Sequence, residues 1–332
     1  MRAFDRTVRY LCSVVTVGAA PPLCGILPQR GTAMVHRRRL RPGSRFQGLA
    51  VVVTGGVLTL AAVAIAAARP DDVPVEPLGN ATYWGWDGSA LVAKTPQGSG
   101  FTAYAEGGSH SLALKSDGTI TSWGNDGSKL VANTPTGSGF TAIATGTYHS
   151  AALKADGTIT SWGWDTYHQV TNTPTGSDFT AIAAGDSHSV ALKADGTITS
   201  WGDDGFNQVT NTPAGNGFTA IAAGNYHSVA LKADGTVISW GGDSHRVVTN
   251  SPQGSGFTAV AAGAHHSVAL KADGTITSWG WDNNRQVTNT PRGSGFTAIK
   301  AGANHSSALK ADGTIISWGD DNVTQVTNIY PK

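Results

Sequence analysis

The chain has 332 residues, of which 14% are charged, and a formal net charge of +1. The charge is uneven: residues 1–78 hold 10 basic and 4 acidic side chains, whereas residues 79–332 hold 13 and 18. An acidic folded region lacks the clustered Lys and Arg that phosphate-backbone binding requires, so we expect no nucleic-acid partner. Both cysteines, Cys12 and Cys24, precede residue 34, so disulfide and thiolate chemistry is excluded from the rest of the chain.

The first 78 residues have the composition of a targeting segment. Arginines follow Met34, and an uncharged apolar run then covers residues 48–68. This pattern predicts a signal peptide over residues 34–68, after a disordered extension at residues 1–33; Met1 and Met34 both remain possible starts. The run of 21 residues is also long enough to span a bilayer, so an uncleaved helical anchor is the alternative. Both interpretations place the folded part outside the cytoplasm, secreted or membrane-anchored, behind a proline-rich linker at residues 69–78.

Residues 79–332 consist of a 39-residue repeat. A fixed period of this length indicates a solenoid, a propeller or an array. Within one unit, the runs FTAIAAG, HSVALKADG, TITSWG and QVTNTP are rich in Val, Ile, Thr and aromatics, and Gly and Asp-Gly turns separate them. Three or four antiparallel strands per unit, repeated around a ring, predict an all-β protein with the β-propeller fold. The repeated Trp is expected to pack between blades; the copies are Trp84, Trp123, Trp162, Trp201, Trp240, Trp279 and Trp318.

The number of blades is left open by the repeat. Seven Trp-Gly pairs but only six His-Ser pairs occur, because the repeat region opens in mid-unit at Ala81. A seven-position ring with one incomplete blade is favoured, since each Trp is expected to have a neighbouring blade. A six-position ring, with the first half-unit spare, is the alternative.

The differences between units map to one end of the predicted blades. Turns of the KADGT and TPTGSG type alternate with the variable loops and lie at the opposite end. Aromatic residues with Arg are typical anchors of protein interfaces, so we predict that the variable face binds a partner, with harmless drift in loops as the alternative. The predicted partner-binding residues are Trp86, Tyr148, Trp164, Tyr167, His168, Asp186, Asp203, Asp204, Phe206, Tyr226, His245, His265, Trp281 and Arg285.

Two repeated polar residues are interpreted as structural. The His of each His-Ser pair is expected to be buried and hydrogen-bonded in every blade, rather than catalytic or metal-binding. The Asp that recurs from Asp87 to Asp321 is expected to cap a turn, with an acidic collar for a basic partner or a cation as the alternative. No hydrolase, zinc or phosphate-loop motif occurs. We therefore expect no enzyme activity, no cofactor and no metal.

The unit GxxHSxALKADGTITSWGxD resembles the repeat of the regulator of chromosome condensation family, which implies a seven-bladed propeller. The short step, the secretory start and the half-unit opening are most similar to a bacterial branch of that family that inhibits β-lactamases. This resemblance implies a monomeric, non-catalytic propeller that clamps a secreted β-lactamase-like enzyme through loop aromatics and acids. The alternatives are a cell-wall or carbohydrate-binding module, in which Trp86, Trp164 and Trp281 stack on sugars, and a polysaccharide-acting enzyme.

Overall fold

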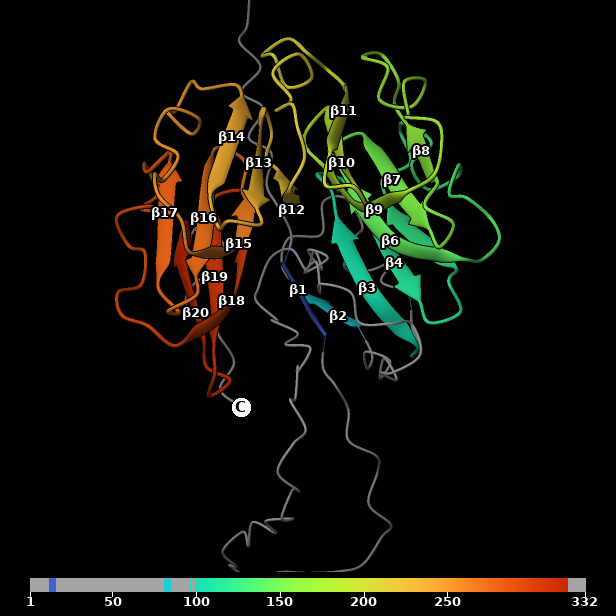
Figure 1. Ribbon diagram of the computed structural model, residues 1–332. Helices are drawn as coiled ribbons and strands as arrows, with labels where there is room; N and C mark the ends of the chain where they lie inside the picture. The colour runs from blue at the N-terminus through green and yellow to red at the C-terminus, as the bar shows by residue number, and fades with distance from the viewer. Residues whose placement is uncertain (1–11, 16–80, 85–95, 97–98, 322–332) are drawn as a thin grey trace, which may run out of the picture.

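A computed structural model describes residues 12–15, 81–84, 96 and 99–321, and every regular element in these residues is a strand (Figure 1). The all-β prediction is confirmed. The predicted signal or anchor helix lies outside the described residues. Within them no helix is present, and therefore none that could cross a membrane.

Six three-stranded antiparallel sheets form the blades of a propeller, and each takes its strands from consecutive stretches of chain. In each blade the second strand is central, and a register shift interrupts its pairing with the first strand next to the repeated Phe. The strands are β3 (Phe101–Glu106), β4 (His110–Lys115), β5 (Ile120–Gly124), β6 (Phe140–Thr145), β7 (His149–Lys154), β8 (Ile159–Gly163), β9 (Phe179–Ala184), β10 (His188–Lys193), β11 (Ile198–Gly202), β12 (Phe218–Ala223), β13 (His227–Lys232), β14 (Val237–Gly241), β15 (Phe257–Ala262), β16 (His266–Lys271), β17 (Ile276–Gly280), β18 (Phe296–Ala301), β19 (His305–Lys310) and β20 (Ile315–Gly319).

The fourth run of each unit, QVTNTP, is not a strand, although its Val and Thr residues suggested one. In the β6–β8 unit, Asp165 Oδ1 accepts hydrogen bonds from the amides of Val170 and Thr171, at 2.7 and 2.9 Å. The Thr173 hydroxyl donates to the Val170 carbonyl at 2.7 Å. These bonds use the backbone groups that a strand ladder would need, and Pro174 follows, so the run forms turns.

The hairpin between the second and third strands forms as predicted. In the β10–β11 hairpin, Asp195 Oδ1 accepts from both the amide and the hydroxyl of Thr197, at 2.9 and 2.7 Å. Gly196 adopts φ 79°, and its amide donates to the Lys193 carbonyl at 3.0 Å. A positive φ is readily available to Gly, which explains the Asp-Gly pair at this turn in every unit.

The repeated Trp packs between blades, which confirms the prediction. Trp201 is 3% exposed and lies in a cluster with Leu153, Phe179 and Ala191 of the two adjoining blades. Its indole Nε1 donates to the carbonyl of Gln169, in the preceding unit, at 2.9 Å. The same bond joins Trp162 to Leu130, Trp240 to Gln208, Trp279 to Val247 and Trp318 to Gln286.

A ladder of hydrogen bonds between His and Ser side chains also links neighbouring blades. His188 is fully buried, and its Nε2 lies 2.8 Å from Ser228 Oγ in the next blade. Burial lowers the pKa of His188 to about 4. The prediction of a buried, hydrogen-bonded histidine is therefore confirmed. The other pairs are His110–Ser150, His149–Ser189, His227–Ser267 and His266–Ser306, and in these the pKa of the histidine falls to about 3, again mainly through burial.

The six described blades follow one another in chain order around an axis. Each first strand packs on the next first strand, in the order β3, β6, β9, β12, β15, β18, whereas β18 and β3 have no comparable packing in the described part of the chain. In the view of Figure 1, β1 (Cys12–Val15) and β2 (Ala81–Trp84) lie between β18 and β3, and they pair with each other in antiparallel fashion. Six complete blades agree with both the six-position and the seven-position ring. The half-unit that would distinguish the two ring sizes lies largely outside the described residues.

Candidate partner-binding face

The variable loops gather at one end of the propeller, as predicted. In each blade, a backbone hydrogen bond joins the loop between the first and second strands to the segment after the third strand. Trp164 N donates to Tyr148 O at 2.8 Å, Asp203 N to Ser187 O at 2.9 Å, and Trp281 N to His265 O at 2.9 Å. Both variable positions of a blade are therefore held side by side.

One group of aromatic rings lies on the β6–β8 blade. Trp164 is half-buried between two tyrosines, with ring centroids 5.1 Å from Tyr148 and 5.7 Å from Tyr167, both at steep angles. Such edge-to-face contacts fix the orientation of the rings. Tyr167 leaves 44% of its surface exposed, so the group offers a fixed apolar surface to solvent.

A second group continues over the next three blades. The Phe206 ring lies 5.0 Å from Tyr226, which lies 5.8 Å from His265. His245 and Trp281 complete the group: His245 lies 4.9 Å from His265 and 5.5 Å from Trp281. Phe206 is 48% exposed and His245 is exposed, whereas Tyr226, His265 and Trp281 are half-buried.

Two carboxylates lie between the groups. The carbonyl of Asp186 accepts from the amide of Thr147, next to Tyr148, and the amide of Asp186 donates to the carbonyl of Asn225, next to Tyr226. The pKa of Tyr226 is raised mainly by burial and further by the charges of Asp186 and Asp203 and by Tyr148 and Tyr167, so these four groups act on Tyr226. They join the two groups into one surface. We call this surface the aromatic crescent; its members are Tyr148, Trp164, Tyr167, Asp186, Asp203, Phe206, Tyr226, His245, His265 and Trp281.

The repeated Asp caps its own loop, which confirms the turn-capping interpretation. Asp204 Oδ1 accepts from the amides of Val209 and Thr210, at 2.8 and 2.9 Å, and its Oδ2 accepts from the Thr210 hydroxyl. These bonds hold the pKa of Asp204 below its usual value, although partial burial acts in the opposite direction. Asp204, predicted to bind a partner, is thus engaged within its loop.

His168 and Arg285 share a strained loop position. Both are exposed and adopt φ 62°, a left-handed conformation that L-residues rarely take. Neither takes part in the ring contacts of the crescent. The remaining predicted residue, Trp86, lies outside the described residues.

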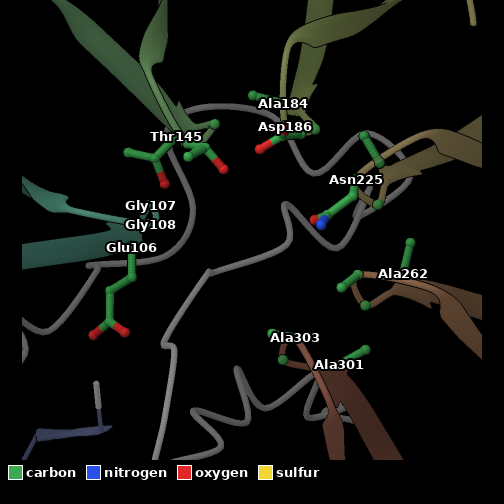
Figure 2. A pocket seen from close by; sticks show the side chains of 18 residues that line it. Glu106, Gly107, Gly108, Thr145, Ala184, Asp186, Asn225, Ala262, Ala301 and Ala303 are labelled. Carbon is green, nitrogen blue, oxygen red and sulfur yellow. The ribbon is translucent and has the colours of Figure 1, made fainter. Parts of the chain in front are cut away.

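One member of the crescent, Asp186, lines the mouth of the central channel (Figure 2). The hollow at this mouth is lined by the turns after the first strands, and the side chains of Asp186 and Asn225 turn into it. Backbone hydrogen bonds tie these turns together around the mouth: Thr147 N to Asp186 O, Asp186 N to Asn225 O, Asn225 N to Ala264 O and Ala264 N to Ala303 O, at 3.0–3.3 Å.

Two features of this end were missed by the sequence analysis. The variable loops are anchored by a buried residue at their sixth position, such as Gln169 and Gln208, so these loops are only partly available to a partner. The recurrence of Gln at this position was the available signal. The structure also buries Lys300 on β18, where five units have Ala, and burial lowers its pKa to about 7.

The structure holds no group of three or more His, Cys, Asp or Glu that could bind a metal ion among the residues it describes. The fold and this face define a repeat β-propeller with one variable, aromatic-rich end.

Comparison with known families identifies the repeat. The Regulator of chromosome condensation (RCC1) repeat matches residues 140–169, 179–208, 218–246, 257–286 and 296–325. The chain therefore carries RCC1-family repeats, as its sequence pattern predicted. No curated protein sequence matches the chain.

Solved structures share the fold at low identity. The ectodomain of the Physcomitrella patens receptor kinase CR4 is 23% identical, with a TM-score of 0.61, and the match covers 76% of this chain and 69% of that one. The ectodomain of the Arabidopsis thaliana receptor kinase ACR4 is 22% identical, with a TM-score of 0.62 and coverages of 74% and 89%. Prp20p from Saccharomyces cerevisiae is 19% identical, with a TM-score of 0.59 and coverages of 72% and 80%.

Proposed function

We propose that this protein is an exported, non-catalytic propeller that binds another protein through the aromatic crescent. The observation that carries the proposal is the crescent itself: rings held by edge contacts, on the positions where the units differ. Tyr, Trp and Phe are the residues that most often anchor protein interfaces. Because contacts such as those of Trp164 with Tyr148 and Tyr167 orient the rings before binding, little conformational entropy is lost on association.

Proteins with the same fold support this class of function. Prp20p was crystallised in a study of its binding to Gsp1p and histones, and yeast RCC1 was crystallised with Kap60 bound. Two further structures are ectodomains of receptor kinases. The proposal of a non-catalytic role rests on the periodic histidines, which are buried in the ladder between blades.

A secreted β-lactamase-like enzyme is the partner we propose to test first. The reasons are the resemblance of the 39-residue unit and the export signal predicted over residues 34–68. A carbohydrate is disfavoured as the ligand, because Tyr148 and Tyr167 both contact the Trp164 ring, which would have to present a free face to a sugar.

The test is a titration of the purified protein into a panel of secreted class A β-lactamases, with substrate hydrolysis as the readout. We expect stoichiometric inhibition of at least one enzyme. Trp164→Ala combined with Tyr226→Ala should weaken inhibition by about 30-fold or more, since truncating an interface anchor costs about 2 kcal/mol or more. Arg292→Ala, a change at an exposed position at the end of the blades opposite the crescent, is the matched control.

Two outcomes would contradict the proposal. If the double variant lost as much folding stability as binding, the rings would be core residues and not a docking surface. If the protein inhibited no enzyme but was retained on cell-wall glycan in a crescent-dependent manner, carbohydrate binding would replace protein binding.

A further inference from the structure

The β9–β11 blade differs from the other five described blades in its acidity. It has an acid at both variable positions, Asp186 before β10 and Asp203 after β11. At the position of Asp186 the other blades have Gly108, Thr147, Asn225, Ala264 and Ala303. The hydrogen bond from Asp203 N to Ser187 O holds the two positions next to each other, at the rim of the channel mouth.

The two carboxylates have only uncharged hydrogen-bond donors among the residues that the structure describes. The pKa of Asp186 is raised by burial, lowered by a hydrogen bond from the Thr147 hydroxyl, and raised again by Asp203. No Lys, Arg or His of the described chain is among the groups that act on it. Asp203 accepts from Gly205 N at 3.0 Å and from Gln208 Nε2 at 3.3 Å, which are both uncharged donors. Among the described residues, no cation therefore neutralises the negative charge at this point.

Two tyrosines lie in the turns that flank Asp186. Tyr148 follows Thr147, whose amide donates to the Asp186 carbonyl at 3.2 Å, and Tyr226 follows Asn225, whose carbonyl accepts from the Asp186 amide at 3.3 Å. Tyr226, from the β12–β13 loop, lies within electrostatic reach of both carboxylates and of Tyr148 and Tyr167 from the β6–β8 blade. The face of a tyrosine ring attracts a cation, and a carboxylate pairs with it directly. Acids framed by aromatic rings are thus complementary to a cation that also has apolar surface. A guanidinium fits best, since it is planar, stacks on rings and offers several donors to carboxylates.

We infer that Asp186 and Asp203, framed by Tyr148, Tyr167 and Tyr226, receive an arginine side chain from a loop of the protein that docks on the crescent. We call these five residues the acidic notch. The inference rests on the proposed function and adds the chemistry of the partner. In this arrangement the crescent supplies apolar contact area, and the acidic notch fixes the orientation of the partner through one charged contact.

The test uses N-acetyl-L-arginine methylamide as the probe and the isosteric, uncharged N-acetyl-L-citrulline methylamide as its control. Each is titrated into the full-length protein and followed by the NMR signals of the aromatic rings. We expect the arginine compound to bind at least about tenfold more tightly than the citrulline compound, and 0.5 M NaCl to reduce that difference. Asp186→Asn combined with Asp203→Asn should abolish the difference in affinity. Asp178→Asn, which changes an exposed acid at the end of the blades opposite the crescent, should keep it.

Equal affinity for the two compounds, or discrimination that survives in the double Asn variant, would overturn the inference. So would binding of Ca²⁺ by the wild-type protein with no response to the arginine compound, because the acids would then form a metal site. Failure of the proposed function is distinguishable. A protein partner that depends on Trp164 but not on Asp186 and Asp203 would refute only the acidic notch. Arginine binding without any crescent-dependent protein partner would refute only the proposed function.

Discussion

Lowering the pH from 7.5 to 5 should destabilise this propeller sharply, because the histidines of the ladder between blades remain neutral in the folded protein. Burial lowers the pKa of His188 to about 4, and it lowers the pKa of the other four histidines that bond to Ser to about 3, from an ordinary 6.5. Above pH 6.5 both folded and unfolded chains are neutral at these sites. Below it the unfolded chain binds protons that the folded chain does not, so stability falls until the pH reaches 3 to 4.

The magnitude follows from the distance between the pH and the unfolded pKa. At pH 5 each histidine costs about 2 kcal/mol, at about 1.4 kcal/mol per pH unit, and five together cost about 10 kcal/mol. A typical domain has only about 5–15 kcal/mol of stability. The propeller is therefore expected to approach unfolding near pH 5, well before most of its carboxylates are protonated.

Urea denaturation followed by tryptophan fluorescence, at several pH values from 7.5 to 5, measures the effect. The slope of unfolding free energy against pH gives the number of protons taken up on unfolding, which should approach five near pH 5. His188→Gln should lower that number by about one, and His168→Gln, at an exposed loop position, serves as the control. An unfolding free energy that stayed constant from pH 7.5 to 5 would refute the argument.

Three further predictions concern single positions, each measured by urea denaturation. Gly185→Ala should destabilise by at least about 3 kcal/mol, because the new Cβ would lie 2.3 Å from the carbonyl oxygen of Gly224 in the next blade; a change under 1 kcal/mol would show that the blades can separate there. Asp178→Gly should stabilise by up to about 1 kcal/mol, since Asp178 has φ 79° where Gly217 stands in the next unit; a loss of stability would contradict this. Lys300→Met should stabilise by about 3 kcal/mol at pH 8, because burial lowers the lysine pKa to about 7 and only the unfolded chain binds the lysine proton between pH 7 and 10.5. The gain in stability should shrink as the pH approaches 10.5. A gain that did not depend on pH would indicate an effect of packing instead.

Much of the fold could be predicted because each unit repeats the same environment. A residue such as Trp201 or His188 that recurs at every step performs a task that every blade shares, so its role is structural. From Ser150 onward, the Ser that follows each His is also the hydrogen-bond partner of the His one blade earlier. The repeat alone does not show this pairing. The sequence left open whether the QVTNTP run is a fourth strand, because Val and Thr favour strands, while the Asp that binds its amides lies five residues away.

The candidate site was only partly predictable. Comparison of the units distinguishes the two acids. Asp204 stands at a position that is Asp in every unit and caps its loop, whereas Asp203 stands at a position that varies between units. The sequence could not show that Tyr226 of one blade lies near Asp186 and Asp203 of another, since this depends on how the blades are arranged around the axis. The degree of exposure was also hidden: Trp164 and Trp281 are half-buried against their neighbours, whereas Tyr167 and Phe206 project.

The series of backbone hydrogen bonds along the channel mouth affects how binding specificity can change. Its bonds join the amide of one turn to the carbonyl of the next, through positions occupied by Thr147, Asp186, Asn225, Ala264 and Ala303. Since peptide groups alone make these bonds, the side chains at the five positions can be exchanged with little loss of the framework beneath them. Mutation can thus alter the recognition surface one blade at a time, and the same property makes these positions suitable for randomisation when new binding proteins are selected.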